Sequence, residues 1–93
     1  MAIFLKDPAA TLDYAVDWQA AYLGGQTILQ SQWRVVPEGV DGVVVTASGL
    51  DGGRAVVTLA GGTVGNQYRV TNRVTLSDGR NDERSVDVRV EDR

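Results

Sequence analysis

Apolar and polar residues alternate on both sides of an Asp-Gly pair near the C-terminal end of the chain. The apolar positions are Tyr68, Val70, Val74 and Leu76 before the pair, and Val86, Val88 and Val90 after it. A period of two is typical of a strand with one buried face, and two such strands around Asp-Gly predict a β-hairpin. Residues 65–90 are therefore expected to form one long hairpin.

The register of this hairpin follows if both apolar rows are kept on one face. A two-residue Asp78-Gly79 turn would set Val70 opposite Asp87, which places a core position against a solvent position. A three-residue turn, Ser77-Asp78-Gly79, with Gly79 at a bulge restores the parity. The resulting pairs are Tyr68 with Val88, Val70 with Val86, Arg69 with Asp87, Thr71 with Ser85, and Arg73 with Glu83.

The rest of the chain carries shorter strand patterns separated by turn residues. Strands are expected at residues 12–18, at 26–36 with a bulge near Leu29 or Gln30, at 43–47 and at 55–60. Residues 49–53 are expected to form a loop, and Asp7-Pro8 an extended segment. A short helical turn is expected at residues 18–23, after a possible N-cap at Asp17.

These elements predict an all-β fold. About six to seven strands with no βαβ pattern favour an antiparallel immunoglobulin-like sandwich, in a single domain over residues 1–93. Tyr68 begins the penultimate strand just after Gly65, which is the position of the tyrosine corner of such sandwiches. Its hydroxyl would then bond to backbone a few residues upstream, whereas an ordinary half-buried strand tyrosine is the alternative.

Composition argues against catalysis. The chain has 93 residues with no cysteine and no histidine, so disulfides and the commonest general base and metal ligand are excluded. A domain of this size has a thin core and no room for a deep active site. We therefore predict no enzyme, no catalytic, cofactor-binding or metal-binding residues and no cofactor. The missing disulfides also favour folding in a reducing cytoplasm.

The charge pattern limits the partners. The formal net charge is −3, and nine basic residues are scattered among twelve acidic ones rather than gathered on one stripe. Nucleic-acid binding, which needs a basic face, is therefore not expected. No apolar run approaches the roughly 20 residues that span a bilayer, so no membrane partner is expected. The start at Met1 favours a complete soluble protein, although a cloned fragment would look the same.

Two clusters of residues could suggest ligand binding. The first, Asp78, Asn81, Asp82 and Glu83, offers oxygen ligands to calcium but lacks the spacing of a twelve-residue calcium loop. A solvated hairpin tip is the favoured interpretation. The second, Gly61-Gly62-Thr63-Val64-Gly65, resembles a phosphate cradle, but it lacks the Lys-Ser/Thr pair and precedes a strand. A turn is favoured there.

The two tryptophans and the strand edges are the remaining candidates. Trp18 and Trp33 could form an aromatic platform for sugars, but their parity favours the core. Gln32 and Arg34, on the opposite parity from Trp33, fit a solvated or subunit-facing surface. The edges of a small sandwich can also accept a strand from another chain.

A series of short segments, in order along nearly the whole chain, resembles small bacteriophage and prophage virion proteins of the fibre-tail adaptor type. The segments are Asp7-Pro8, Leu12-Asp13-Tyr14 with Asp17-Trp18, Leu23 with Thr27-Ile28, Ser31-Gln32-Trp33, Leu59 with Gly61-Gly62-Thr63, Tyr68 to Asn72, and Thr75 to Arg80 with Asp82 to Ser85.

The resemblance implies a non-enzymatic structural virion protein at the head-tail or tail-fibre junction. Its expected partners are other virion proteins of the tail, connector or fibre, and further copies of itself in the particle. The expected location is the virion, preceded by the cytoplasm of the bacterial host. The alternative is an immunoglobulin-like adhesion or carbohydrate-binding module of a bacterial protein, which should expose Trp18 or Trp33.

Overall fold

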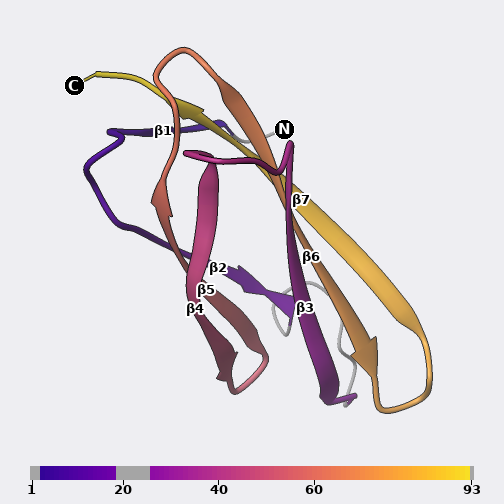
Figure 1. The fold of residues 1–93 in the computed structure, drawn as a ribbon. Helices are drawn as coiled ribbons and strands as arrows, with labels where there is room; N and C mark the ends of the chain where they lie inside the picture. The colour runs from indigo at the N-terminus through magenta and orange to yellow at the C-terminus, as the bar shows by residue number, and fades with distance from the viewer. Residues whose placement is uncertain (1–2, 19–25, 93) are drawn as a thin grey trace.

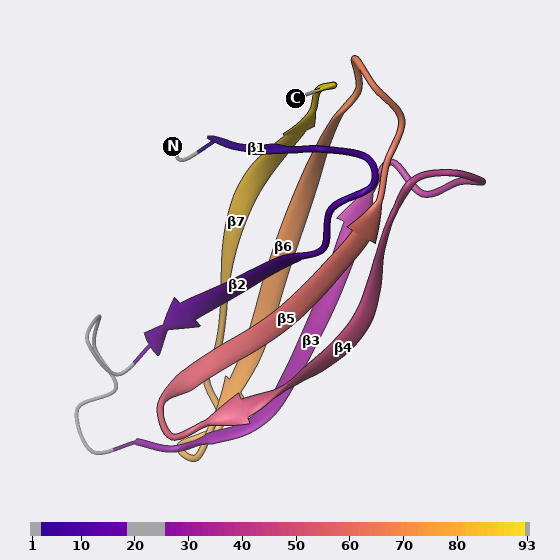
Figure 2. The same ribbon diagram turned by 90° about the vertical axis from the view of Figure 1, so that its left-hand side faces the viewer.

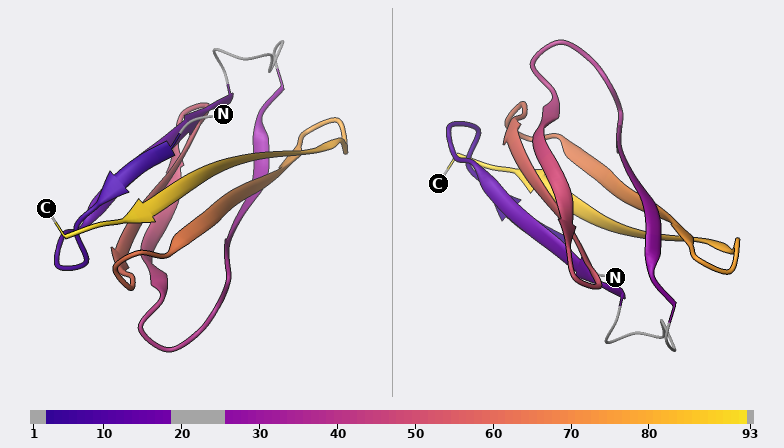
Figure 3. Two further views of the ribbon diagram at one scale, coloured as in Figure 1. Left: turned by 90° about the horizontal axis from the view of Figure 1, so that it is seen from above. Right: turned by 90° about the horizontal axis from the view of Figure 1, so that it is seen from below.

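The computed structural model describes residues 3–18 and 26–92, and these residues form a sandwich of two β-sheets (Figure 1). The strands are β1 (Ile3–Lys6), β2 (Leu12–Asp17), β3 (Ile28–Val36), β4 (Val43–Asp51), β5 (Arg54–Gly61), β6 (Gln67–Leu76) and β7 (Asn81–Val90). One sheet has the order β1-β7-β6-β3 and the other β2-β5-β4. Seen from above and below, the sheets lie in two layers (Figure 3). The predicted all-β fold is confirmed.

The predicted hairpin is present, and its register is the expected one. Tyr68 pairs with Val88, and Val70 with Val86. The turn residues are Ser77, Asp78 and Gly79, because the Leu76 N–H donates to the Arg80 carbonyl at 2.8 Å. Gly79 has a φ of 90°, a left-handed conformation that glycine adopts without strain.

The other predicted elements agree with the structure in part. The bulge in β3 lies between Ile28 and Gln30, as expected. The loop expected at residues 49–53 is wrong, because β4 continues to Asp51 and pairs with β5 along that length. Gly49 lowers strand propensity there, but the ladder to β5 outweighs it. The helical turn expected at residues 18–23 lies, except for Trp18, outside the described residues.

The N-terminal segment differs most from expectation. The sequence does not predict β1, because Ile3-Phe4-Leu5 shows no alternation. The strand pairs in parallel with β7 at the edge of the sheet. In Figure 2, β1 lies at the upper end of β7, toward the C-terminus. Asp7-Pro8 does not continue as an extended segment. Instead the Ala10 N–H donates to the Asp7 carbonyl at 3.0 Å and the Ala9 N–H to its carboxylate at 2.8 Å, which makes a tight turn.

The core lies between the sheets and is built from every second residue of the central strands. Its larger cluster comprises Val35, Val43, Val57, Leu59, Tyr68, Val70, Val86, Val88 and Val90. Tyr68 also forms the predicted tyrosine corner, since its hydroxyl accepts a hydrogen bond from the Thr63 N–H at 3.1 Å. This bond lowers the pKa of Tyr68, and the amide of Asn66 adds to the effect. The corner fixes the β5–β6 connection to the start of β6.

A buried amide holds the smaller part of the core together. Asn72 occupies an inward position of β6 and is fully buried. Its Oδ1 accepts a bond from Trp18 Nε1 at 2.8 Å, and its Nδ2 donates to Ser31 Oγ at 2.8 Å and to the Gln32 carbonyl at 3.1 Å. The Arg84 guanidinium lies 5.1 Å from the centroid of the Trp18 ring. Asn72 thus ties the end of β2 to β3 and β6.

The β1 end of the sandwich is closed by a buried lysine. Lys6 is 2% exposed, and its Nζ donates to the Gly61 carbonyl at 2.6 Å and to the Asp7 carbonyl at 2.9 Å. Burial lowers the pKa of Lys6 below its ordinary value of 10.5, and the nearby Asp7 carboxylate opposes this only in part. The ammonium therefore links β1 to the end of β5.

Val70→Asp is expected to unfold the protein. Val70 is fully buried, and an unpaired charge at such a position costs about 3 to 5 kcal/mol, close to the whole stability of a small domain. Circular dichroism and thermal melting measure the effect. Val40→Asp is the matched control, because Val40 is 94% exposed. Retention of the parent melting temperature by Val70→Asp would contradict the core assignment.

Asn72→Ala is expected to lower the free energy of unfolding by about 2 to 3 kcal/mol, because it leaves buried polar groups on Trp18 and β3 without their partner. Urea titration followed by tryptophan fluorescence measures this loss. Asn81→Ala is the control, since its bond with Thr75 is exposed and its removal should change stability by less than about 0.5 kcal/mol. Equal losses in both variants would contradict the role of Asn72.

Lys6→Met is expected to change how stability depends on pH. Because the folded-state pKa of Lys6 is lowered, the unfolded chain binds more protons between that pKa and 10.5, so stability rises with pH there. Urea titrations of both proteins from neutral pH to 10.5 should show the parent gaining stability relative to Lys6→Met. If the stability of the two proteins depended on pH in the same way, the lowered pKa of Lys6 in the folded protein would be contradicted.

Candidate functional site

The two outer faces of the sandwich differ in chemistry. On the four-stranded sheet, polar side chains of β6 and β7 pair with one another across the strands. Arg69 Nε lies 3.1 Å from Asp87 Oδ1, the Thr71 and Ser85 hydroxyls are 2.7 Å apart, and Arg73 bonds to Glu83 at 3.2 Å. These are the predicted outer pairs. These cross-strand contacts pair most of the polar groups of β6 and β7 on this face with one another.

The outer face of the three-stranded sheet is instead lined with small apolar residues. Ala55, Val57 and Leu59 of β5 are buried in the core, so the alternate residues Val56 and Thr58 face outward. Residues paired across strands share a face, and the pairing registers place Ala15 and Gly49 beside Val56, and Asp13 and Ala47 beside Thr58. Ala15, Val56 and Gly49 therefore form an uncharged row at the centre of this face, with Asp13 toward one end.

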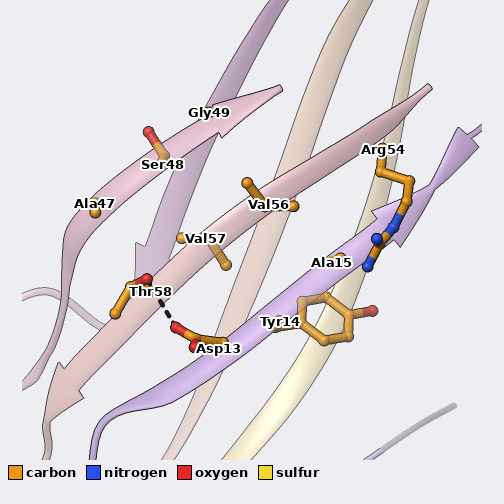
Figure 4. Close-up of a pocket in the computed structure, with 10 residues that line it drawn as sticks. All are labelled: Asp13, Tyr14, Ala15, Ala47, Ser48, Gly49, Arg54, Val56, Val57 and Thr58. Atoms are coloured by element: carbon orange, nitrogen blue, oxygen red, sulfur yellow. Dashed lines mark hydrogen bonds between the residues drawn. The ribbon is translucent and has the colours of Figure 1, made fainter. Parts of the chain in front are cut away.

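A shallow depression of about 480 Å³ covers this face (Figure 4). Its lining residues are Asp13, Tyr14 and Ala15 of β2, Ala47, Ser48 and Gly49 of β4, and Arg54, Val56, Val57 and Thr58 of β5. The short side chains of Ala15, Ala47 and Gly49 leave the space that makes the surface concave. We name this surface the β2-β5-β4 face.

Polar groups mark the two ends of the β2-β5-β4 face. At one end, the Thr58 hydroxyl donates to the Asp13 carboxylate at 2.8 Å. At the other end, Arg54 lies 3.9 Å from Asp51, and both side chains are more than half exposed. An apolar floor between polar ends suits the side chains of another protein, since burial of apolar area favours association and polar rims orient it.

The residues considered as a calcium loop lie in the hairpin and bond to their neighbours. Asp78 accepts bonds from the backbone and side chain of Arg80, which lower the pKa of Asp78. Asn81 Oδ1 accepts from the Thr75 hydroxyl, and Asp82 Oδ1 from the Glu83 N–H. Within residues 3–18 and 26–92, no group of three or more Asp or Glu residues is placed to hold a metal ion.

The other predicted positions also have structural roles. Gly61 ends β5 and residues 62–65 lie in the β5–β6 connection, with Gly61, Gly62 and Gly65 at positive φ. Trp18 is fully buried, as its predicted core position requires. Trp33 is half-buried and packs against both parts of the core.

A smaller depression of about 250 Å³ lies on the four-stranded sheet. It is lined by Gln32, Trp33, Arg34, Thr71, Arg73 and Glu83. Gln32 and Arg34 are exposed there, as expected of a solvated or subunit-facing surface.

The sequence interpretation did not find the β2-β5-β4 face. The available signal was the presence of alanine, glycine and valine at outward positions of neighbouring strands, where polar residues are usual. Recognising it requires the pairing of β4 with β5, which the expected loop at residues 49–53 obscured. In the described part of the chain, no helix has the length and apolar character needed to cross a membrane.

Comparisons with known proteins bear on both fold and family. Residues 6–89 match a family model described as podophage GP4 fiber-tail adaptor protein gp77. No curated protein matches the chain. A solved structure, the PKD domain from the KIAA 1837 protein, is similar with a TM-score of 0.59 at 21% identity, and the match covers 97% of this chain and 78% of that chain. This likeness supports the immunoglobulin-like fold alone.

Proposed function

Because the chain belongs to the family of podophage GP4 fibre-tail adaptor proteins gp77, we propose that it is a non-enzymatic structural protein of a phage or prophage virion. The match over residues 6–89 is the observation that carries the proposal, since it includes β2 to β6 and all of β7 except its last residue. In this role the protein binds other virion proteins at the tail-fibre or head-tail junction. Its mechanism is the presentation of a rigid surface to its neighbours.

The β2-β5-β4 face is the surface we assign to this binding. Its floor is apolar, whereas the opposite outer face satisfies its own charges through pairs such as Arg69 with Asp87. A protein partner gains free energy by covering apolar surface, and it gains little by displacing ion pairs that already exist. The asymmetry between the two faces therefore favours the β2-β5-β4 face as the contact.

We also propose that several copies of this chain act together in the particle, arranged symmetrically. The absence of cysteine fits folding in the host cytoplasm before assembly. The scattered charges and the net charge of −3 support contacts with protein rather than nucleic acid.

The alternative, a carbohydrate-binding module, has less support. A sugar platform needs an exposed aromatic ring, and Trp18 has no exposed surface. Trp33 is half-buried between two parts of the core. The residues that would carry sugar recognition are thus used for packing.

Ala47→Glu tests the proposed contact. A phage lacking the gene for this chain would be complemented with the parent or with the variant, and particles with attached fibres counted by electron microscopy. A charge at Ala47, which lines the depression beside Thr58, should reduce fibre-bearing particles at least roughly tenfold, because it would be buried unpaired at the interface.

Thr75→Glu is the matched control, since Thr75 lies on the opposite outer face and its hydroxyl bond to Asn81 is exposed. Circular dichroism must show both variants folded. If Ala47→Glu particles carried the normal number of fibres, the assignment of the contact to the β2-β5-β4 face would be contradicted. Normal fibres on particles that lack the chain altogether would overturn the junction role.

A further inference from the structure

Strand β4 is a long edge strand with no charged side chain before its last residue, Asp51. It is the last strand of its sheet, with β5 on one side only (Figure 4). Between Val43 and Leu50 it contains no charged residue and no proline. Every residue after Val43 is exposed, including Val44, Val45 and Leu50. Such an edge offers unpaired backbone groups to another strand.

The other sheet edges carry features that discourage strand addition. β1 is four residues long. β2 carries Asp13 and Asp17, and β3 carries Arg34 and is followed by Pro37. Short length, charge and proline are the usual means by which proteins protect an edge. β4 has only a bulge between Val45 and Ala47.

The backbone of β4 is also unpaired on its outer side. Across residues 3–18 and 26–92, no backbone hydrogen bond joins β4 to any segment other than β5. β3 approaches from the opposite sheet but belongs to a different ladder. Among the described residues, the outward carbonyl and amide groups of β4 therefore have no strand partner.

Acidic residues stand at both ends of this edge. Asp41 precedes β4 in an exposed turn, and Asp51 ends the strand with its side chain 76% exposed. Arg54 approaches Asp51 only to 3.9 Å and is itself half exposed, so it compensates this charge weakly. The edge thus has an uncharged centre about 26 Å long between two negative ends.

We propose that β4 accepts an extended segment of a partner protein as an added strand of the β2-β5-β4 sheet. The complementary segment has β-branched, uncharged residues in its centre and lysine or arginine at its ends, facing Asp41 and Asp51. This inference rests on the proposed function in one respect only, that the partner is a virion protein. A symmetric antiparallel pairing of two copies through β4 is disfavoured, because it brings Asp51 of one copy toward the Asp41 end of the other.

Hydrogen exchange measured by NMR on the full chain tests the inference. The probe is a synthetic peptide of alternating threonine and valine, long enough to span β4, with lysine at both ends. It should slow exchange of alternate β4 amides, since strand pairing bonds every second residue of the edge. A peptide with glutamate at both ends should bind roughly tenfold more weakly at low salt.

Asp41→Asn with Asp51→Asn should remove this preference, while Asp92→Asn, an exposed acid outside the sheet, should keep it. No slowing of β4 exchange by the lysine peptide would overturn strand addition. Equal binding of both peptides would overturn the assigned charge complementarity. Concentration-dependent slowing without peptide would identify a second copy as the occupant instead.

These results separate strand addition from the proposed function. Contact through side chains of the β2-β5-β4 face alone would leave the outer amides of β4 exchanging freely, yet Ala47→Glu would still remove fibres from particles. If the peptide adds to β4 and Ala47→Glu particles still carry normal fibres, strand addition at β4 would be supported. Binding of the partner through the β2-β5-β4 face would then be contradicted.

Discussion

Strand β6 pairs with β7 on one side and with β3 on the other, so its register decides which side chains of the larger sheet face the core. A slip of one residue would turn Val70 outward and Arg69 inward. The observed register instead buries the valine rows and leaves charged partners opposite one another on the surface. The tyrosine corner at Tyr68 and the amide of Asn72 depend on the same register, because both lie on the inward side of β6.

The same register sets the chemistry of the outer face of the larger sheet, and the smaller sheet differs from it. On the larger sheet, charged side chains of β6 form ion pairs with those of β7 at the surface. The smaller sheet has no such ladder at its centre, where Ala15, Val56 and Gly49 lie side by side. A sandwich of this size can therefore keep one face in water while the other is covered by a partner, which suits a protein of the fibre-tail adaptor family.

The smaller sheet also differs at its edge. β2 carries acidic side chains, whereas β4 is uncharged over most of its length. The unpaired backbone groups of such an edge can pair with a strand of another chain unless a partner already covers them. The apolar face and the open edge adjoin through Ala47 and Gly49, so one partner could cover both and join the sheet through its backbone while it packs against the floor.

The sequence by itself determined the hairpin register, the bulge in β3 and the tyrosine corner, because each depends on alternation or turn chemistry within a short stretch. Only the tertiary structure decided the parallel pairing of β1 with β7, the full length of β4 and the burial of Lys6. Trp18 and Asn72 are 54 positions apart, and Lys6 and Gly61 are 55 apart. Such contacts, like the apolar face made by three strands, arise only when distant segments are packed together, and no local pattern records which segments those are.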